Sequence, residues 1–207
     1  DIGADETNDT VVYRIDDNLA EYPTADFSTI NGIQNAIDYL VANNVAGSVR
    51  LEVYSGTYNA ITVPVNMPSM PLEIVEFAGQ TAIISQAAAV NLVLINGADY
   101  VTIDGFTIQN CTQDGVKITN TAIGATIKNC SMASLGTSGS YAGINVDGNS
   151  DSAVITGNTI TSDYYGINYQ GTTAVRLDNC VISNNAITIT GQYDIRMEYC
   201  NKTTISY

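Results

Sequence analysis

Carboxylates are the residues of this chain best placed for chemistry, because it contains no histidine. The commonest general base and zinc ligand is therefore missing. Asp104 and Lys128 hold equivalent positions in two consecutive sequence repeats, and Asp178 and Glu198 hold that position in later ones. On an exposed sheet these side chains would form a charged ladder, which is compatible with acid–base catalysis. Because alternating charge is also typical of an ordinary solvated face, we assign no catalytic residue.

Three oxygen-bearing side chains, Asp147, Asn149 and Asp151, stand at alternate positions, as they do at the start of a calcium loop. The match then ends, because Ser152 replaces the expected glycine and Asn158 replaces the bidentate glutamate. The same residues are ordinary turn formers. We therefore expect either no cofactor or Ca²⁺ bound at these three residues.

Tyrosines form a second candidate site late in the chain. Tyr141 and the pair Tyr164 and Tyr165 each precede a strand of adjacent repeats, so their rings should share one edge. A tyrosine ring offers a rigid apolar face and a polar tip, which suits a sugar ring or a protein surface. We predict a ligand-binding role for these three residues, with simple packing of the rings over the turns as the alternative.

The cysteines allow two interpretations. Cys130, Cys180 and Cys200 align at one position of the repeat, where neighbouring turns would be about 4.8 Å apart. Cys180 and Cys200 would then be close enough for a disulfide, whereas Cys130 would be too far from Cys180. The other interpretation is a ladder of buried thiols that pack as small hydrophobes. No CxxC spacing supports metal or redox chemistry.

The elements that would position these residues are short repeated strands. Six-residue segments recur at steps of about 20 to 28 residues, beginning at Ile103, Ile127, Ile155 and Leu177. A second block follows each of them, beginning at Gly115, Gly143, Gly166 and Ala186. A period of this length with small-residue turns predicts a solenoid, whose turns stack in register around an aliphatic interior. We predict an all-β parallel solenoid of about seven coils over residues 49–207.

Two segments precede the solenoid. Residues 26–48 are predicted to hold a capping α-helix, with Asp26 or Ser28 as the N-cap and one apolar face. That face comprises Phe27, Ile30, Ile33, Ile37, Leu40 and Val41. Such a helix would cover the open apolar end of the first turn. Residues 1–25 are predicted to be irregular, apart from a β-like run over residues 10–15.

The predicted helix, the segment VRLEVYSGTY at 49–58 and the Asn- and Gly-rich repeats together resemble the right-handed parallel β-helix proteins of the pectin-lyase-like superfamily. The resemblance implies that fold for about residues 26–207. Polygalacturonase-like members use Gly-His-Gly and Arg-Ile-Lys motifs, which are missing here. Pectate-lyase-like members use clustered calcium-binding aspartates with a basic residue, for which Arg176 and Arg196 are additional candidates.

The first six residues, DIGADE, resemble a segment near the end of β-helix regions in large secreted or surface proteins of Bacteroidetes-type bacteria. This resemblance implies that residues 1–6 are the tail of a preceding module. The opening is acidic and has no apolar stretch, so we expect a mature chain or an excised piece of a secreted or cell-surface protein.

Composition limits the partners. The formal net charge is −14, with only 7 lysines and arginines, so we expect no nucleic-acid partner. No apolar run is long enough for a membrane span, so we expect no membrane insertion. We predict a non-enzymatic structural or adhesive module that presents loops and tyrosines to a glycan or another surface protein.

Two alternatives remain open at this stage. One is a polysaccharide lyase or glycoside hydrolase that uses carboxylates on the coil wall, although the missing histidine favours a chain without catalytic activity. The other is a self-assembling filament subunit that stacks end to end, since the last repeat carries no cap in the sequence.

Overall fold

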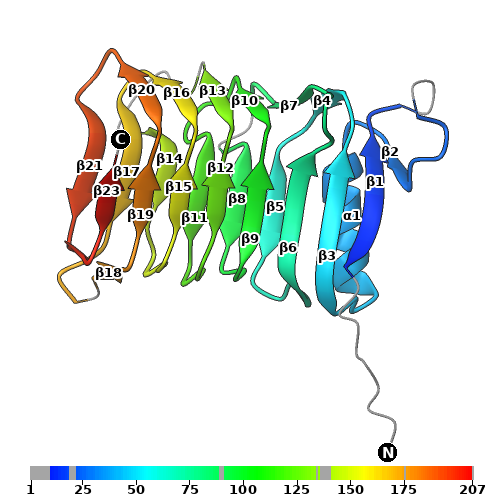
Figure 1. Cartoon of the computed structure of the whole chain (residues 1–207), viewed down its shortest axis with the longest axis horizontal. Coiled ribbons are helices and arrows are strands. Elements are labelled where there is room, and N and C mark those ends of the chain that lie inside the picture. Colours follow the sequence, from blue (N-terminus) through cyan, green and yellow to red (C-terminus); the bar gives the residue numbers. More distant parts are fainter. Residues whose placement is uncertain are drawn as a thin grey trace, which may run out of the picture.

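The computed structural model describes residues 10–18, 22–88, 91–133, 135, 141–174 and 176–206. These residues form an all-β parallel solenoid with one short helix near the N-terminal end (Figure 1), which confirms the predicted fold class. None of the helical segments described is long and apolar enough to cross a membrane.

Three parallel sheets, which we call A, B and C, form the walls of the solenoid. Sheet A consists, in spatial order, of β2 (Phe27–Ser28), β1 (Val11–Asp16), β3 (Gly47–Val53), β6 (Ser69–Glu76), β9 (Val101–Asp104), β12 (Thr126–Lys128), β15 (Val154–Thr156), β19 (Val181–Ser183) and β23 (Thr204–Ser206). Sheet B consists of β4 (Gly56–Tyr58), β7 (Ala82–Ser85), β10 (Thr107–Gln109), β13 (Ser131–Ala133), β16 (Thr159–Ser162) and β20 (Ala186–Ile189). Sheet C consists of β5 (Ile61–Pro64), β8 (Val93–Asn96), β11 (Val116–Thr119), β14 (Ala142–Val146), β17 (Tyr165–Gln170) and β21 (Tyr193–Glu198), and a small fourth sheet pairs β18 (Leu177–Asp178) with β22 (Cys200–Asn201).

Within the described residues the solenoid has six full turns, each with one strand from each of the three sheets. The predicted number of about seven coils was too high, because it assumed about 22 residues per turn. Thr156 and Ser183, which pair on consecutive turns, are 27 residues apart. The extra residues lie in the corners between sheets, where they lengthen the turn without adding a strand.

An aliphatic column runs along the interior of sheet A, as predicted for Ile103, Ile127 and Ile155. These three side chains pair on consecutive turns and are fully buried. The column continues through Ile182 and Ile205, so the predicted place of Leu177 was wrong. Leu177 lies in β18, where it pairs with Cys200 at a corner.

The second set of repeated segments, which begin at Gly115, Gly143, Gly166 and Ala186, was also aligned wrongly at its last segment. Gly115, Gly143 and Gly166 precede residues that pair with one another along sheet C, as expected. Ala186 lies instead in β20 of sheet B, where it pairs with Thr159. The next strand of sheet C is β21, in which Ile195 pairs with Ile167. The corner before β19 is therefore longer than the sequence repeat predicted. Every later segment consequently lies one sheet earlier in the turn than predicted, as Ala186 does in sheet B instead of sheet C.

The helix α1 spans Gly32–Ala42 and begins six residues later than predicted, with Asn31 as its N-cap. Asp26 does not cap it, because its Oδ2 accepts a hydrogen bond of 2.7 Å from the Arg14 amide. Phe27 and Ser28 form strand β2 beside β1. The sheet therefore continues where the apolar spacing predicted a helix.

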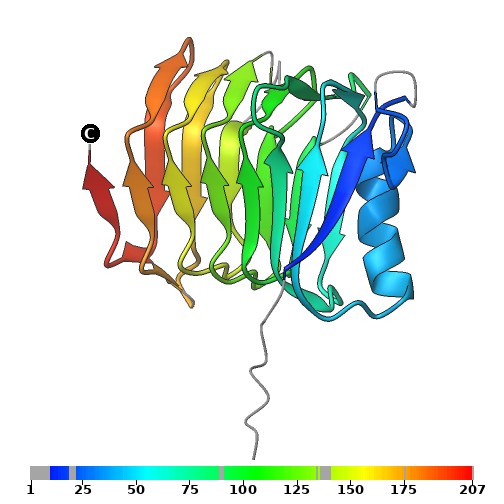
Figure 2. The ribbon, with the colours of Figure 1, turned by 45° about the vertical axis from the view of Figure 1, so that its right-hand side comes forward.

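Helix α1 covers the N-terminal end of the solenoid (Figure 2). Its buried face includes Ile33, Ile37 and Leu40, as predicted, whereas Ile30 precedes the helix and is 53% exposed. The Gln34 side chain accepts a hydrogen bond of 2.7 Å from the Thr62 amide in β5. The helix thus satisfies a backbone donor of the first strand of sheet C as well as covering apolar side chains.

Within residues 1–25, the β-like run forms strand β1, which pairs in parallel with β3 and extends sheet A beyond the first turn. The prediction that residues 1–6 are the tail of a preceding module lies outside the described residues.

Candidate functional site

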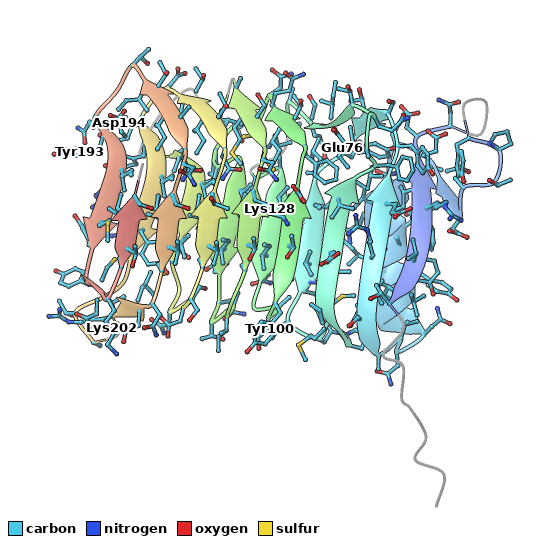
Figure 3. All side chains as sticks on the ribbon, in the orientation of Figure 1. Glu76, Tyr100, Lys128, Tyr193, Asp194 and Lys202 are labelled. Atoms are coloured by element: carbon cyan, nitrogen blue, oxygen red, sulfur yellow. The ribbon has the colours of Figure 1, made fainter. Side chains whose placement is uncertain are left out.

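The charged ladder predicted on sheet A is present only in part. Lys128 pairs with Asp104 in register, and its Nζ lies 3.3 Å from the Asp104 Oδ2 (Figure 3). The positions that follow are held by hydroxyl side chains, namely Thr156, Ser183 and Ser206. The predicted places of Asp178 and Glu198 were wrong, because Asp178 lies in β18 and Glu198 lies in sheet C. Sheet A therefore presents no row of carboxylates in the part of the chain that the structure describes.

Other carboxylates on the solenoid wall are neutralised by neighbouring cations. Glu73 and Glu52 lie 2.8 and 3.4 Å from nitrogens of Arg50. Glu198 contacts Arg196 at 2.6 Å. These pairs indicate a solvated, structurally engaged wall.

The three residues predicted to bind calcium have separate partners. Asp147 Oδ2 lies 3.1 Å from the Lys117 Nζ, and Asp151 Oδ1 accepts a hydrogen bond of 2.8 Å from the Asp178 amide. Asn149 adopts a left-handed turn conformation with a φ of 66°. Among the described residues, no group of three or more acidic, cysteine or histidine side chains is arranged to hold a metal ion. Calcium binding at these residues stays a prediction.

A connected row of polar side chains, which we call the sheet C polar row, crosses the later turns of sheet C. Its members are Asp114, Asn145, Asn168, Arg196 and Glu198. Asn145 Nδ2 donates to Asp114 Oδ2 at 3.0 Å, and Asn168 Nδ2 donates to Asn145 Oδ1 at 3.0 Å. Arg196 continues the row through a bond of 3.2 Å to Asn168 Oδ1. The row thus links four successive turns with alternating donors and acceptors.

Asp114 anchors the inner end of this row. The residue is 2% exposed, and its side chain also accepts a hydrogen bond of 2.8 Å from the Ala142 amide. Burial raises the pKa of this carboxyl, while the hydrogen bonds from Asn145 and Ala142 and the charge of Lys117 act in the opposite direction. The sequence-based prediction did not include this row, although the recurring Gly-Ile-Asn of residues 143–145 and 166–168 signals it.

Two of the three predicted tyrosines, Tyr164 and Tyr165, pack together at the edge of the sheet C polar row, whereas Tyr141 lies beside them through its backbone. The Tyr165 amide donates to the Tyr141 carbonyl at 3.1 Å, so the two lie on adjacent turns. Tyr164 packs edge-on against Tyr165, with ring centroids 4.6 Å apart. Tyr193, which the sequence-based prediction did not include, stacks on Tyr165 at 6.1 Å. We call these four residues the tyrosine edge.

Arg196 joins the tyrosine edge to the sheet C polar row. Its guanidinium carbon lies 5.3 Å from the Tyr165 ring centroid, within the range of a cation–π contact. Tyr165 is 5% exposed and supports the cluster from below, whereas Tyr193 is 55% exposed. The arrangement places an accessible aromatic ring beside a row of hydrogen-bonding groups.

The cysteines do not share one column. Cys130 lies beside Asn158, as predicted, and its amide donates to Asn158 Oδ1 at 3.0 Å. Cys180 immediately precedes β19 of sheet A, because Val181 pairs with Val154. Cys200 lies in β22, where it pairs with Leu177 at a corner. The structure holds all four cysteines as free thiols.

We expect the native chain to expose at most one reactive thiol. Burial raises the pKa of Cys130 and of Cys180 to about 12, so both stay protonated at pH 8 and lack the reactive thiolate. Cys200 is only partly buried and should react first with Ellman's reagent. Cys200→Ser should abolish this fast reaction. After denaturation, the unsubstituted chain should titrate four thiols per molecule. A release of only two would show a disulfide.

The same pKa shifts predict a loss of stability in alkali. Between pH 9 and pH 12 the unfolded chain releases thiol protons that the folded chain retains, so the free energy of unfolding falls as pH rises.

Comparisons with known proteins agree with the geometry. A family model described as a right handed beta helix region matches residues 91–206. No curated protein matches the chain. Among solved structures, the crystal structure of pectate lyase Pel9A matches with a TM-score of 0.53 at 13% sequence identity. The match covers 88% of this chain and 56% of that chain, so it shows a shared fold over about half of the lyase.

Proposed function

The chain belongs to the right-handed β-helix family, and we propose that it is a non-enzymatic adhesive module that binds a neutral glycan on sheet C. The proposed binding surface consists of the tyrosine edge and the outer end of the sheet C polar row. Since a single fold supports both enzymes and binding modules, the proposal depends on this surface and not on the family.

The observation that carries the proposal is the contact of Arg196 with both parts of the surface. Sugar rings have an apolar face and a rim of hydroxyl groups. The exposed Tyr193 ring supplies an apolar platform. Next to it, Arg196 and Gln170 form a hydrogen-bonded group with Glu198, which offers donors and acceptors to hydroxyl groups.

Charge favours a neutral ligand over an acidic one. The formal net charge of −14 produces a negative field that repels polyanions. Within the binding surface the positive charge of Arg196 is balanced by Glu198 at 2.6 Å. An acidic polysaccharide would therefore gain little attraction here, whereas a neutral chain of sugars is not penalised.

Three carboxylates near sheet C, those of Asp114, Asp147 and Glu198, each have a partner within the chain, which favours binding of a glycan over its cleavage. Glycoside hydrolysis requires two carboxyl groups that flank the bond to be cleaved. Near sheet C, the buried Asp114 carboxylate accepts a hydrogen bond from the Ala142 amide. Asp147 forms an ion pair with Lys117, and Glu198 forms an ion pair with Arg196. We propose a location on a secreted or cell-surface protein, where a rigid rod can present the tyrosine edge to an external glycan.

A glycan array followed by calorimetry on the best neutral oligosaccharide tests the proposal. We expect Tyr193→Ala and Arg196→Ala each to weaken binding about tenfold, because one stacking contact or one charged hydrogen bond contributes roughly 1–2 kcal/mol. Tyr100→Ala is the matched control, since Tyr100 is equally exposed but lies on the corner between β8 and β9, at the opposite rim of the solenoid from Tyr193 (Figure 3).

Two results would contradict the proposal. Equal losses in the Tyr100 variant and the Tyr193 variant would mean that binding does not use the tyrosine edge. New reducing ends or unsaturated products released from a polysaccharide would show that the chain is a hydrolase or a lyase.

A further inference from the structure

The outer face of sheet B differs from the other two walls of the solenoid in its charge. Within the part of the chain that the structure describes, the strands of sheet B contain no aspartate, glutamate, lysine or arginine. Sheet A carries the ion pair of Asp104 with Lys128, and sheet C carries the ion pair of Arg196 with Glu198. Because 14% of the residues in this chain are charged, an ordinary solvated wall of this size should carry charges, as the other two walls do.

The side chains on this face are small and mostly bear hydroxyl groups. They form two rows along the solenoid axis, on the outward positions of strands β10, β13 and β16 (Figure 1). We call these residues the sheet B face, which consists of Thr107, Gln109, Ser131, Ala133, Thr159 and Thr161. The neighbouring strands β7 and β20 extend both rows with further hydroxyl or aliphatic side chains.

The positions of these side chains are regular and rigid. Thr107, Ser131 and Thr159 pair on consecutive turns without a register shift. Neighbouring parallel strands lie about 4.8 Å apart, and alternate residues of one strand lie about 6.6 Å apart. Between the outward residues, Ile108 and Ile160 are fully buried, so the strands are anchored from inside. Threonine is also stiff at χ1, because it branches at Cβ. The face is therefore a lattice of hydroxyl and methyl groups at fixed spacings.

The size and chemistry of the sheet B face limit what can bind there. From the strand spacing and the residue rise, its area is roughly 300 Å², even with β7 and β20 included. A stable protein interface buries about 800 Å² on each partner, so a protein would gain too little here. The outward positions of these strands carry no aromatic ring on which a sugar could stack. Because the face has no charge, it is complementary to a neutral partner.

Ice is a neutral partner that presents such a lattice. On the crystal surfaces that run parallel to the long axis of hexagonal ice, water oxygens repeat at distances close to both spacings of the sheet B face. Each hydroxyl group can donate to one lattice water and accept from others. A charged side chain would retain its own hydration shell and disturb this order, and the sheet B face contains none. Sheets A and C share the same strand spacing, but their ion pairs exclude such a match.

We propose that the sheet B face binds ice. Many weak contacts, each from one small side chain, then hold the chain on a growing crystal surface. This activity does not depend on the proposed glycan-binding surface, which lies on sheet C.

Ice crystals grown slowly in a solution of the purified chain test this proposal, without any glycan present. We expect faceted crystals and a freezing temperature that lies below the melting temperature. Thr159→Lys and Thr161→Lys should each abolish both effects, because the lysine ammonium is a strongly hydrated charge in the middle of the face. Tyr193→Ala should leave both effects unchanged, so a failure of the glycan proposal would be seen separately.

Thr126→Lys is the matched control for the two lysine variants. It makes the same substitution at an outward threonine of a parallel strand, but in sheet A. This variant should shape ice as the original chain does, and circular dichroism should show that all variants fold. Round, unfaceted crystals at high concentrations of the original chain would overturn the proposal. An equal loss in the Thr126 variant and the Thr159 variant would overturn it as well.

Discussion

Ile127→Ala is expected to lower the free energy of unfolding by about 3–4 kcal/mol. Ile127 is fully buried and lies between Ile103 and Ile155 in the sheet A column. Removing its outer carbons leaves a cavity that parallel strands on both sides hold open, because their register is fixed by backbone hydrogen bonds. Urea unfolding followed by far-UV circular dichroism measures the loss.

Ile205→Ala is the matched control for this loss. Ile205 continues the same column at the open end, but it is 42% exposed and has no turn above it in the described chain. The same truncation there should cost less than about 1 kcal/mol. Equal costs at the two positions would contradict a column that is closed at Ile127 and open at Ile205.

The sequence predicted this column correctly only as far as Ile155. Up to that point each six-residue segment contains one aliphatic strand position followed by one turn. The segments beginning at Ile103, Ile127 and Ile155 can therefore be aligned with one another in only one way. Two overlapping segments then fit the same pattern, one beginning at Leu177 and one at Ile182. Choosing between them requires the length of the corner before β19. Corner lengths vary because corners face solvent and bury few side chains.

The predicted start of the helix is wrong for a related reason. Phe27 fits the apolar spacing of a helix that begins at Asp26, yet its ring packs edge-on against Tyr13 and Tyr39, at 5.9 and 5.7 Å. Tyr13 lies on β1, outside the segment in which the helical spacing is read. Tertiary contacts of this kind override local spacing, and no short window of sequence contains them.

The sequence predicted those parts of the candidate site whose residues occupy the same position in consecutive repeats. Tyr141 immediately precedes β14 and Tyr165 begins β17, so their neighbourhood followed from the repeat. The sheet C polar row depends on a longer relation, since Asp114 lies 31 residues from its partner Asn145. Local sequence patterns indicate a turn wherever asparagine occurs, whereas stacking converts Asn145 and Asn168 into a hydrogen-bonded ladder within strands.

Gly166→Ala is expected to lower the free energy of unfolding by about 3 kcal/mol, although it adds only one carbon atom. Gly166 is covered by the sixth turn, and a Cβ there would overlap the Ile187 side chain and lie 2.5 Å from the Asp194 carbonyl oxygen. The backbone oxygen cannot move without breaking the pairing of β17 with β21. The added carbon therefore separates the last turn from the fifth.

Gly79→Ala separates this packing effect from the general cost of replacing glycine. Gly79 has a positive φ of 80°, but no heavy atom lies within 4 Å of a Cβ added there, so only backbone strain should appear, at about 1 kcal/mol. Urea unfolding of both variants gives the difference. In the Gly166 variant hydrogen exchange should also rise selectively in β20 and β21, because the last turn is the part that must shift. Equal costs in the two variants, with unchanged exchange in the last turn, would show that the sixth turn tolerates a side chain beneath it.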